Sequence, residues 1–546
     1  MLRLTLLCAL LYGAGLGRYA LSNPDEARYA EIPREMLAAG DFVTPRLNGV
    51  KYFEKPPLVY WLVAGSLAAF GPGEAAARAV PAVFGLLGVL LLYGTVRRIH
   101  GRDAAWWAAL VLATSLLYFV HTRILLIDMV VSVLISAVLS CFLLGVREPP
   151  GARRRALFYG LYASAALATL AKGLIGFLLP GAVMFLWLLL FNQWRRLRPF
   201  YLPSGLVLFA LIAAPWHVLV AQRNPEWAWF YFVHEHWLRF TTTTHGRYEP
   251  WWFFLPVLLL GFFPWSGFLF PGLRRAAAGG WARRGPNADG WFPLLWAAFI
   301  LLFFSASQSK LVPYILPVLP PLAWVMGRRI AELRAERDDA VWRWPLGIGA
   351  ALAGLIGAGL VIVVMKLGVV TSPEMLAHLR PLAWPAGSAL LAGSGVSWWL
   401  LRRHRPHQAV AALVACAGLL YYTLLLAAPV IAHPGTKSLA EIVAREADGD
   451  DVVLHYHEFF HDFTYYARCT VGTVAAEGEL EVFLDGEAQR SGRFLAEADL
   501  EKLWTGPLQV YLVVRRRELP ELQKNPWFHA RILGEEPSHV LLSNHY

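Results

Sequence analysis

Carboxylates stand at two unusual places in this sequence. Asp128 interrupts an apolar run at residues 124–130, and a carboxylate in such surroundings needs a cationic partner. Arg123 is the nearest base, so a structural ion pair and a direct role toward a substrate are both open. Asp25 and Glu26 follow the first apolar run, where they could handle a proton or a cation, or simply begin a helix.

Lysines and arginines could bind an anionic group. Lys55 follows Glu54 and precedes a double proline at positions 56 and 57, which fixes the backbone beside it. A lysine held in this way can grip an anionic head group, although an interfacial anchor gives the same pattern. Lys172, Arg239 and Lys310 are the other available cations.

The composition excludes a soluble protein. Of the 546 residues, 57% are apolar and 16% are charged, whereas soluble domains are about 45–50% apolar and about 25% charged. The many aromatic side chains exclude a disordered chain. The formal charge of +11 does not indicate nucleic-acid binding, because the basic residues lie between hydrophobic runs. We therefore expect a polytopic membrane protein.

Thirteen apolar runs are counted as membrane spans. They cover residues 4–21, 76–96, 104–120, 124–146, 156–171, 174–191, 202–221, 251–273, 291–309, 311–326, 345–365, 382–401 and 409–431. The alternate connections 97–103, 147–155, 195–198, 274–284, 328–343 and 402–405 hold 22 arginines, which is typical of cytoplasmic loops. The N-terminus is then cytoplasmic, and the residues after 431 lie outside. The first run could instead be a cleaved signal peptide, and both interpretations leave residues 22–55 outside.

The sequence thus predicts a mainly α fold with about 13 transmembrane helices and a small C-terminal α/β domain. Residues 1–434 would form the transmembrane domain, with interfacial helices in the outer loop at 22–73 and a long outer loop at 222–250. Residues 435–546 would form a soluble periplasmic domain. We expect its strands at 452–456, 508–514 and 539–543, and its helices at 437–446 and 495–503.

Ionisable side chains are nearly absent from the middle of the predicted spans and gather at their outer ends. A transporter or flippase would carry such groups along a path across the membrane, so a site at the outer surface is favoured. Glu54, His234 and His236 could bind a divalent metal there, although histidines in such a loop more often make ordinary hydrogen bonds. No glycine-rich phosphate loop occurs, which disfavours a nucleotide-sugar donor.

Three blocks of this sequence match a known pattern: residues 25–31, residues 53–61 with the Glu-Lys-Pro-Pro core, and residues 123–128. Together with the many spans and the outer C-terminal domain, they resemble the lipid-to-lipid glycosyltransferases of the C-type fold. The greatest likeness is to the 4-amino-4-deoxy-L-arabinose transferases that modify lipid A, which are related to protein O-mannosyltransferases. The resemblance extends over the whole chain.

The resemblance implies a donor, an acceptor and a location. The donor would be an undecaprenyl-phosphate sugar and the acceptor a phosphate of lipid A in the bacterial inner membrane. The cationic product would give resistance to polymyxin and other cationic peptides. We expect a monomer with no nucleic-acid partner and no certain cofactor. Another polyprenyl-phosphate-sugar transferase, such as a protein O-mannosyltransferase, is the alternative; a flippase of lipid-linked sugar is less favoured.

The expected site combines these residues. Asp25 and Lys55 are the predicted catalytic pair: Asp25 orients the acceptor or collects its proton, and Lys55 stabilises the departing phosphate. Glu54 or Asp128 could hold the ammonium group of the sugar. The expected substrate-binding residues are Glu26, Arg28, Tyr29, Tyr52, Glu54, Arg123, Asp128, Lys172, Arg239, Lys310 and Tyr314.

Overall fold

The computed structural model describes residues 1–233, 249–336, 339–366, 373–431, 435–476 and 492–545. Its contacts divide the chain into two compact units. The helical unit comprises residues 1–16 and 78–427, and the mixed unit comprises residues 17–77 and 428–546. The expected boundary at 434 differs from this division, because residues 17–77 make their contacts with the C-terminal residues.

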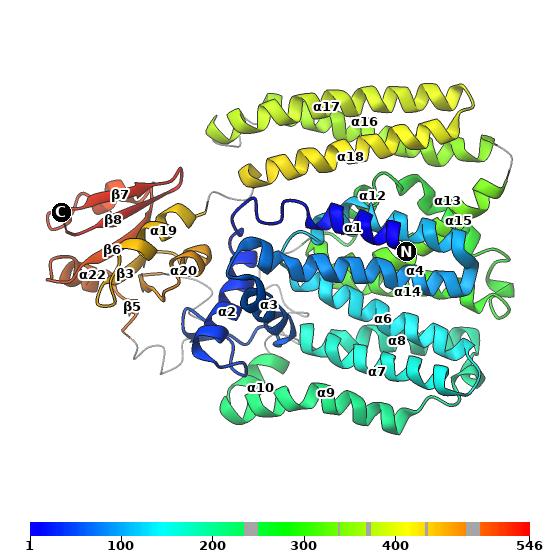
Figure 1. Cartoon of the computed structure of the whole chain (residues 1–546), viewed down its shortest axis with the longest axis horizontal. Helices are drawn as coiled ribbons and strands as arrows, with labels where there is room; N and C mark the ends of the chain where they lie inside the picture. Colours follow the sequence, from blue (N-terminus) through cyan, green and yellow to red (C-terminus); the bar gives the residue numbers. More distant parts are fainter. Residues whose placement is uncertain (234–248, 337–338, 367–372, 432–434, 477–491, 546) are drawn as a thin grey trace. The chain divides into compact units, whose positions relative to one another are not determined.

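The helical unit consists of helices that run alongside one another (Figure 1). In chain order they are α1 (Leu2–Gly13), α4 (Glu74–Ala113), α5 (Leu116–His121), α6 (Ile127–Arg147), α7 (Ala152–Lys172), α8 (Ile175–Phe191), η1 (Trp194–Leu197), α9 (Leu202–Arg223), α10 (Trp227–Trp229), α12 (Phe254–Gly261), η3 (Ser266–Phe268), α13 (Leu269–Ala276), η4 (Trp281–Arg283), α14 (Ala288–Ala306), η5 (Val312–Val318), α15 (Leu319–Ala335), η6 (Asp339–Trp342), α16 (Arg343–Lys366), α17 (Pro373–Arg402) and α18 (Pro406–Ile431).

Several of these helices are long and apolar enough to cross a membrane. Among the described residues, six meet this criterion, and a bent pair made of α12 with η3 and α13 raises the number to seven. Helices α1 and α8 are apolar but have only 12 and 17 residues. The expected total of about 13 spans therefore stays a prediction.

Two breaks interrupt the helical pattern at residues that favour them. Gly101 has φ 85° inside α4, a conformation that costs glycine little, and it separates the two spans expected at 76–96 and 104–120. The span expected at 251–273 is bent by 114° between α12 and η3. Pro264 lies at this bend and has no amide hydrogen with which to continue a helix.

The arginine-rich connections of the helical unit are tied to one another. Asp289 accepts hydrogen bonds from Arg147 and from Arg196, the latter at 2.7 Å. Two further contacts cross between these connections, joining Arg275 to Glu332 and Arg343 to His404. Five of the six segments expected on one side of the membrane therefore meet at one end of the helices.

The mixed unit contains one six-stranded sheet in the order β5-β4-β3-β6-β8-β7. Strands β5, β4, β3 and β6 pair in parallel, whereas β8 is antiparallel to both β6 and β7. The elements are α2 (Asp25–Ala39), β1 (Arg46–Leu47), β2 (Val50–Lys51), α3 (Leu58–Phe70), α19 (Lys437–Glu446), β3 (Val452–Tyr456), α20 (His461–Ala467), β4 (Gly472–Val474), β5 (Phe494–Leu495), α22 (Glu497–Trp504), β6 (Val510–Arg515), α23 (Leu519–Leu522), β7 (Arg531–Glu535) and β8 (His539–Ser543). Strands β3 and β8 and helix α19 coincide with the expected segments.

Alternation along β6 builds a core on each face of the sheet. Val510, Leu512 and Val514 pack in one buried cluster with residues of α22. Tyr511 and Val513 pack in a second cluster with residues of α19 and α20. Successive side chains of a strand point to opposite faces, so a strand that is apolar throughout can be covered on both sides.

The N-terminal segment of the mixed unit is fixed to the C-terminal part by a buried carboxylate. Asp462 is fully buried and accepts hydrogen bonds from the Asn23 side chain and from the Thr436 hydroxyl, the latter at 2.9 Å. The Asp462 amide in turn donates to Asn23 Oδ1 at 2.9 Å. A buried carboxylate is stable only when such donors satisfy it, so this contact holds the start of α2 against α20.

The hairpin of β1 and β2 is a second attachment. Its turn residues Asn48 and Gly49 have φ 54° and 71°, which is typical of a tight Asn-Gly hairpin turn. The carboxylate of Glu35 accepts the amide hydrogens of both residues at 2.6 and 2.9 Å. The Asn48 side chain pairs with the backbone of Val471 in both directions, at 2.9 and 2.8 Å. The hairpin thus joins α2 to the segment that precedes β4.

We expect Glu35 to make stability depend on pH. Burial and the nearby Glu31 raise the pKa of Glu35 from 4.5 to about 7. Between pH 4.5 and 7 the folded protein binds more protons than the unfolded chain, so stability falls as the pH rises through this window, by at most about 3 kcal/mol. The apparent Tm of Glu35→Gln should fall less from pH 5 to pH 8 than that of the parent.

The exposed Glu501→Gln variant is the control and should keep the parental pH dependence. Equal pH dependence in all three proteins would contradict the assignment to Glu35.

Candidate functional site

Asp25 and Arg28 form an ion pair on the first turn of α2. The guanidinium of Arg28 donates to Asp25 and to the Tyr52 hydroxyl, the latter at 3.1 Å. It also lies 5.4 Å from the ring centroid of Tyr29. The Arg28 side chain is 8% exposed whereas that of Asp25 is 49% exposed. Arg28 therefore orients a carboxylate that solvent or a substrate can reach.

Glu26, the acid next to Asp25, points to a different partner. It is buried and accepts hydrogen bonds from the amide and hydroxyl of Ser22 at 3.1 and 3.0 Å. These contacts fix the chain just before α2, which begins at Asp25. The two adjacent acids thus differ: Glu26 stabilises the helix entry, and Asp25 faces outward.

Glu54 and Lys55 lie close together before α3. Lys55 Nζ donates to the Glu54 carbonyl oxygen at 2.9 Å and lies 3.6 Å from Glu54 Oε2. The side chains are 11% and 18% exposed for Lys55 and Glu54, so both are largely removed from solvent. The two prolines that follow restrict the backbone, and α3 begins directly after them at Leu58.

Asp128 has Lys172 as its partner in the helical unit. Asp128 stands in the first turn of α6 and Lys172 is the last residue of α7. Their side chains form an ion pair and are 12% and 13% exposed. Lys172 Nζ also lies 4.8 Å from the ring centroid of Tyr314, a favourable cation-π distance. A cavity of only about 10 Å³ adjoins these three residues.

Arg123 contacts backbone carbonyl oxygens rather than Asp128, the partner that its position in the sequence suggested. Its guanidinium donates to the carbonyl oxygens of Leu11, Tyr12 and Ala14 at 2.9, 3.0 and 2.5 Å. These carbonyls lie at the end of α1, where a helix leaves its last acceptors unsatisfied. Arg123 thereby terminates α1, and its expected contact with a substrate stays a prediction.

Lys310 is buried and binds carbonyl oxygens. Its Nζ donates to Ser307 at 2.6 Å and to Glu249 at 2.8 Å. Arg239 and the two histidines of the possible metal site, His234 and His236, lie outside the described residues. Among the residues that are described, no group of three or more His, Cys, Asp or Glu could hold a metal ion. The possible divalent metal with Glu54 is therefore untested.

The structure thus gathers the expected residues into two groups, one in each unit. Asp25, Glu26, Arg28, Tyr29, Tyr52, Glu54 and Lys55 belong to the mixed unit, and Arg123, Asp128, Lys172, Lys310 and Tyr314 belong to the helical unit. In each group a carboxylate contacts a cation and a tyrosine contacts that cation. The cation of such a group is of the type that binds a phosphate, and its carboxylate is of the type that binds an ammonium group.

Sequence reasoning missed the residues that support the first group. Asp462, Asn48 and Glu35 fix the segment that carries Asp25 and Lys55. The Asn-Gly pair at 48 and 49 was a recognisable hairpin signal. Nothing local marks Asp462, because its partner Asn23 is 439 residues away.

Comparisons with known proteins all relate this chain to sugar transferases. The model of the dolichyl-phosphate-mannose-protein mannosyltransferase family matches residues 19–232. An undecaprenyl phosphate-α-4-amino-4-deoxy-L-arabinose arabinosyl transferase of Edwardsiella ictaluri is 33% identical over 382 residues, covering 69% of this chain and 67% of the relative. One from Pseudomonas fluorescens is 34% identical and covers 71% of each chain.

This chain belongs to the undecaprenyl phosphate-α-4-amino-4-deoxy-L-arabinose arabinosyl transferase family. Solved structures support this assignment to the family. ArnT from Cupriavidus metallidurans, bound to undecaprenyl phosphate, has a TM-score of 0.85 and 28% identity over 100% of this chain and 98% of its own. The oligosaccharyltransferase of Archaeoglobus fulgidus, at 15% identity and a TM-score of 0.52, shares the fold alone. This member of the family is a multi-pass membrane protein.

We expect the ion pair of Asp128 and Lys172 to be strongly coupled. Removing either partner leaves a poorly solvated charge, which costs roughly 3 kcal/mol. Asp128→Asn and Lys172→Met should each lower the apparent Tm, and the double variant should lose less than the sum of the two. Thermal unfolding of the purified full-length proteins in detergent measures this coupling.

A matched control is the exposed pair of Asp499 and Lys502, in which Lys502 is 77% exposed. Lys502→Met should change stability by less than about 1 kcal/mol. Additive losses at Asp128 and Lys172 would show that the pair is not coupled.

Proposed function

We propose that this chain transfers 4-amino-4-deoxy-L-arabinose from undecaprenyl phosphate to a phosphate group of lipid A. The observation that carries the proposal is the likeness over 100% of the chain to a solved family member bound to undecaprenyl phosphate. The sugar and the lipid carrier are those that the names of the relatives state. The lipid A acceptor is our inference from the blocks at residues 25–31 and 53–61.

The reaction exchanges one phosphate ester of the sugar for another. An oxygen of the lipid A phosphate attacks C1 of the sugar, and the bond from C1 to the donor phosphate breaks with its electron pair. Undecaprenyl phosphate leaves with that negative charge. Because the acceptor is already ionised, alignment and charge neutralisation matter more than a strong general base.

The two groups of residues have the chemistry for these tasks. Lys55 would stabilise the charge that develops on the departing phosphate, since a cation in a partly desolvated position acts strongly there. Asp25, which Arg28 orients, would align the acceptor or collect its remaining proton. Glu54 or Asp128 would bind the ammonium group of the sugar, which gives the modified lipid its positive charge.

The proposed reaction takes place at the periplasmic face of the bacterial inner membrane. The arginine-rich connections that meet at one end of the helical unit support a cytoplasmic assignment for that end. The N-terminus is then cytoplasmic, and the sheet of the mixed unit is periplasmic. The chain would act as a monomer, and the modified lipid A would bind polymyxin and cationic peptides less well.

A second acceptor class is favoured by one observation. The protein mannosyltransferase model matches residues 19–232, which include both groups of site residues up to Lys172. A related transferase could use a polyprenyl-phosphate sugar and a protein hydroxyl. Glycosylated protein with unmodified lipid A would identify that activity.

Mass spectrometry of lipid A from cells with and without the gene tests the proposal. We expect an added aminopentose only when the gene is present. Asp25→Asn and Lys55→Ala should reduce the modified fraction, with an initial rate at least about 100-fold below the parent. Asp499→Asn and Lys502→Ala, which are exposed in the same unit, should retain parental modification.

Two results would contradict the proposal. Lipid A without any mass change would rule out this acceptor and sugar. Parental rates in folded, membrane-inserted Asp25→Asn and Lys55→Ala proteins would rule out their catalytic roles.

A further inference from the structure

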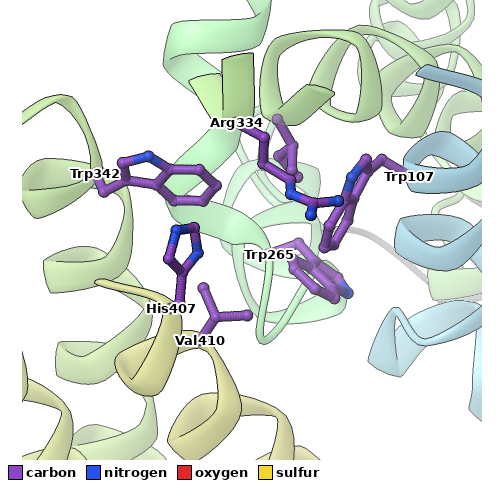
Figure 2. A pocket seen from close by; sticks show the side chains of 7 residues that line it. Trp107, Trp265, Arg334, Trp342, His407 and Val410 are labelled. Carbon is purple, nitrogen blue, oxygen red and sulfur yellow. The ribbon is translucent and has the colours of Figure 1, made fainter. Parts of the chain in front are cut away.

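An aromatic pocket of about 240 Å³ lies in the helical unit. Trp107 of α4, Arg334 of α15 and His407 of α18 contribute to its wall, together with Trp265 and Trp342. Figure 2 shows Trp342 and His407 on one side and Trp107 and Trp265 on the other, with the Arg334 guanidinium beside Trp107. None of these residues belongs to the proposed sugar-transfer site.

The inner wall of this pocket is apolar and rigidly packed. Trp265 and Trp342 are only 4% and 3% exposed. Trp107 meets Trp265 edge to face with 6.1 Å between ring centroids, and Trp342 meets His407 in the same way at 5.8 Å. The indole of Trp265 donates to the Thr114 hydroxyl at 2.8 Å. The tryptophans therefore form a fixed apolar surface.

The rim of the pocket is basic. Arg334 and His407 are both exposed. The guanidinium carbon of Arg334 lies 5.5 Å from the ring centroid of Trp107. Within the part of the chain that the structure describes, no carboxylate pairs with Arg334, whereas the neighbouring Glu332 contacts Arg275 and Arg328. Arg334 thus presents its guanidinium at the exposed rim of the pocket.

The position of the pocket suggests which class of molecule carries the anionic group that it would bind. Arg334 and Trp342 belong to the arginine-rich connection 328–343, and His407 lies two residues after the connection 402–405. Tryptophan is enriched where helices leave a membrane. Ile330 and Val410 also line the pocket, so its apolar wall is not made of aromatic rings alone. Basic pockets between helices at this depth suit lipid head groups.

We propose that this pocket binds the phosphate head group of an anionic phospholipid. The phosphate accepts hydrogen bonds from the Arg334 guanidinium, whose planar fork matches phosphate oxygens. The glycerol part contacts the tryptophans, and the acyl chains extend from the pocket into the surrounding lipid. The volume of 240 Å³ is below the roughly 300–1,000 Å³ of sites that enclose a whole small molecule, which suits a head group whose chains remain outside.

Native mass spectrometry of the full-length protein in detergent tests this site, with phosphatidylglycerol as the probe and phosphatidylcholine as the neutral comparison. We expect one phosphatidylglycerol to be retained in preference to phosphatidylcholine. Arg334→Gln should weaken its binding about tenfold, the loss expected for a charge-assisted hydrogen bond. Arg284→Gln is the matched control, because Arg284 also stacks on a tryptophan, at 4.6 Å from the Trp281 ring, but does not line the pocket.

A second variant tests the pocket without removing a charge. Val410 lines the wall, and Val410→Phe should fill the space and also release the lipid. Equal losses in Arg334→Gln and Arg284→Gln would indicate general attraction to the basic surface and overturn the proposal. Glycerol phosphate that binds as tightly as the intact lipid would show that a soluble phosphate ester is the ligand, which would also overturn it.

Discussion

A charged side chain next to the hydrocarbon of a membrane is stable only with a partner, and this constraint determines where the charged residues of the chain can act. Asp128 and Lys172 satisfy each other at the ends of α6 and α7. Arg123 is satisfied by the carbonyls at the end of α1. A phosphate bound to Lys172 alone would leave Asp128 unpaired. The proposed donor carries both a phosphate and an ammonium group, so it could pair with both side chains.

The residues of the first loop depend on the C-terminal part of the chain for their position. The contact of Asn23 with Asp462 precedes Asp25 by two residues, and the hairpin held by Glu35 and Val471 lies four residues before Lys55. The six-stranded sheet therefore serves as the support for the segment that carries the proposed catalytic pair. In the proposed reaction the C-terminal residues would therefore act by positioning this segment.

Hydrophobic periodicity and composition were sufficient to predict some of the helices and strands of this structure. The apolar runs gave the long helices, and the short β-rich runs located β3 and β8, because burial on both faces leaves a continuous apolar pattern. The partner of Asp128 could not be read from the sequence, since Lys172 is 44 residues away. Arg123, only five residues away, instead binds a helix end 109 to 112 residues distant. Gly101 and Pro264 can be read from the sequence, but the helix breaks at these two residues could not be predicted from it.

Transfer with purified components tests the proposed activity most directly. Full-length protein in detergent would be mixed with undecaprenyl-phosphate-linked aminoarabinose and lipid A, and both lipids would be followed by mass spectrometry. We predict that lipid A gains one aminopentose for each undecaprenyl phosphate released. Release of the sugar to water without modified lipid A, or a donor that stays intact, would contradict the proposed transfer.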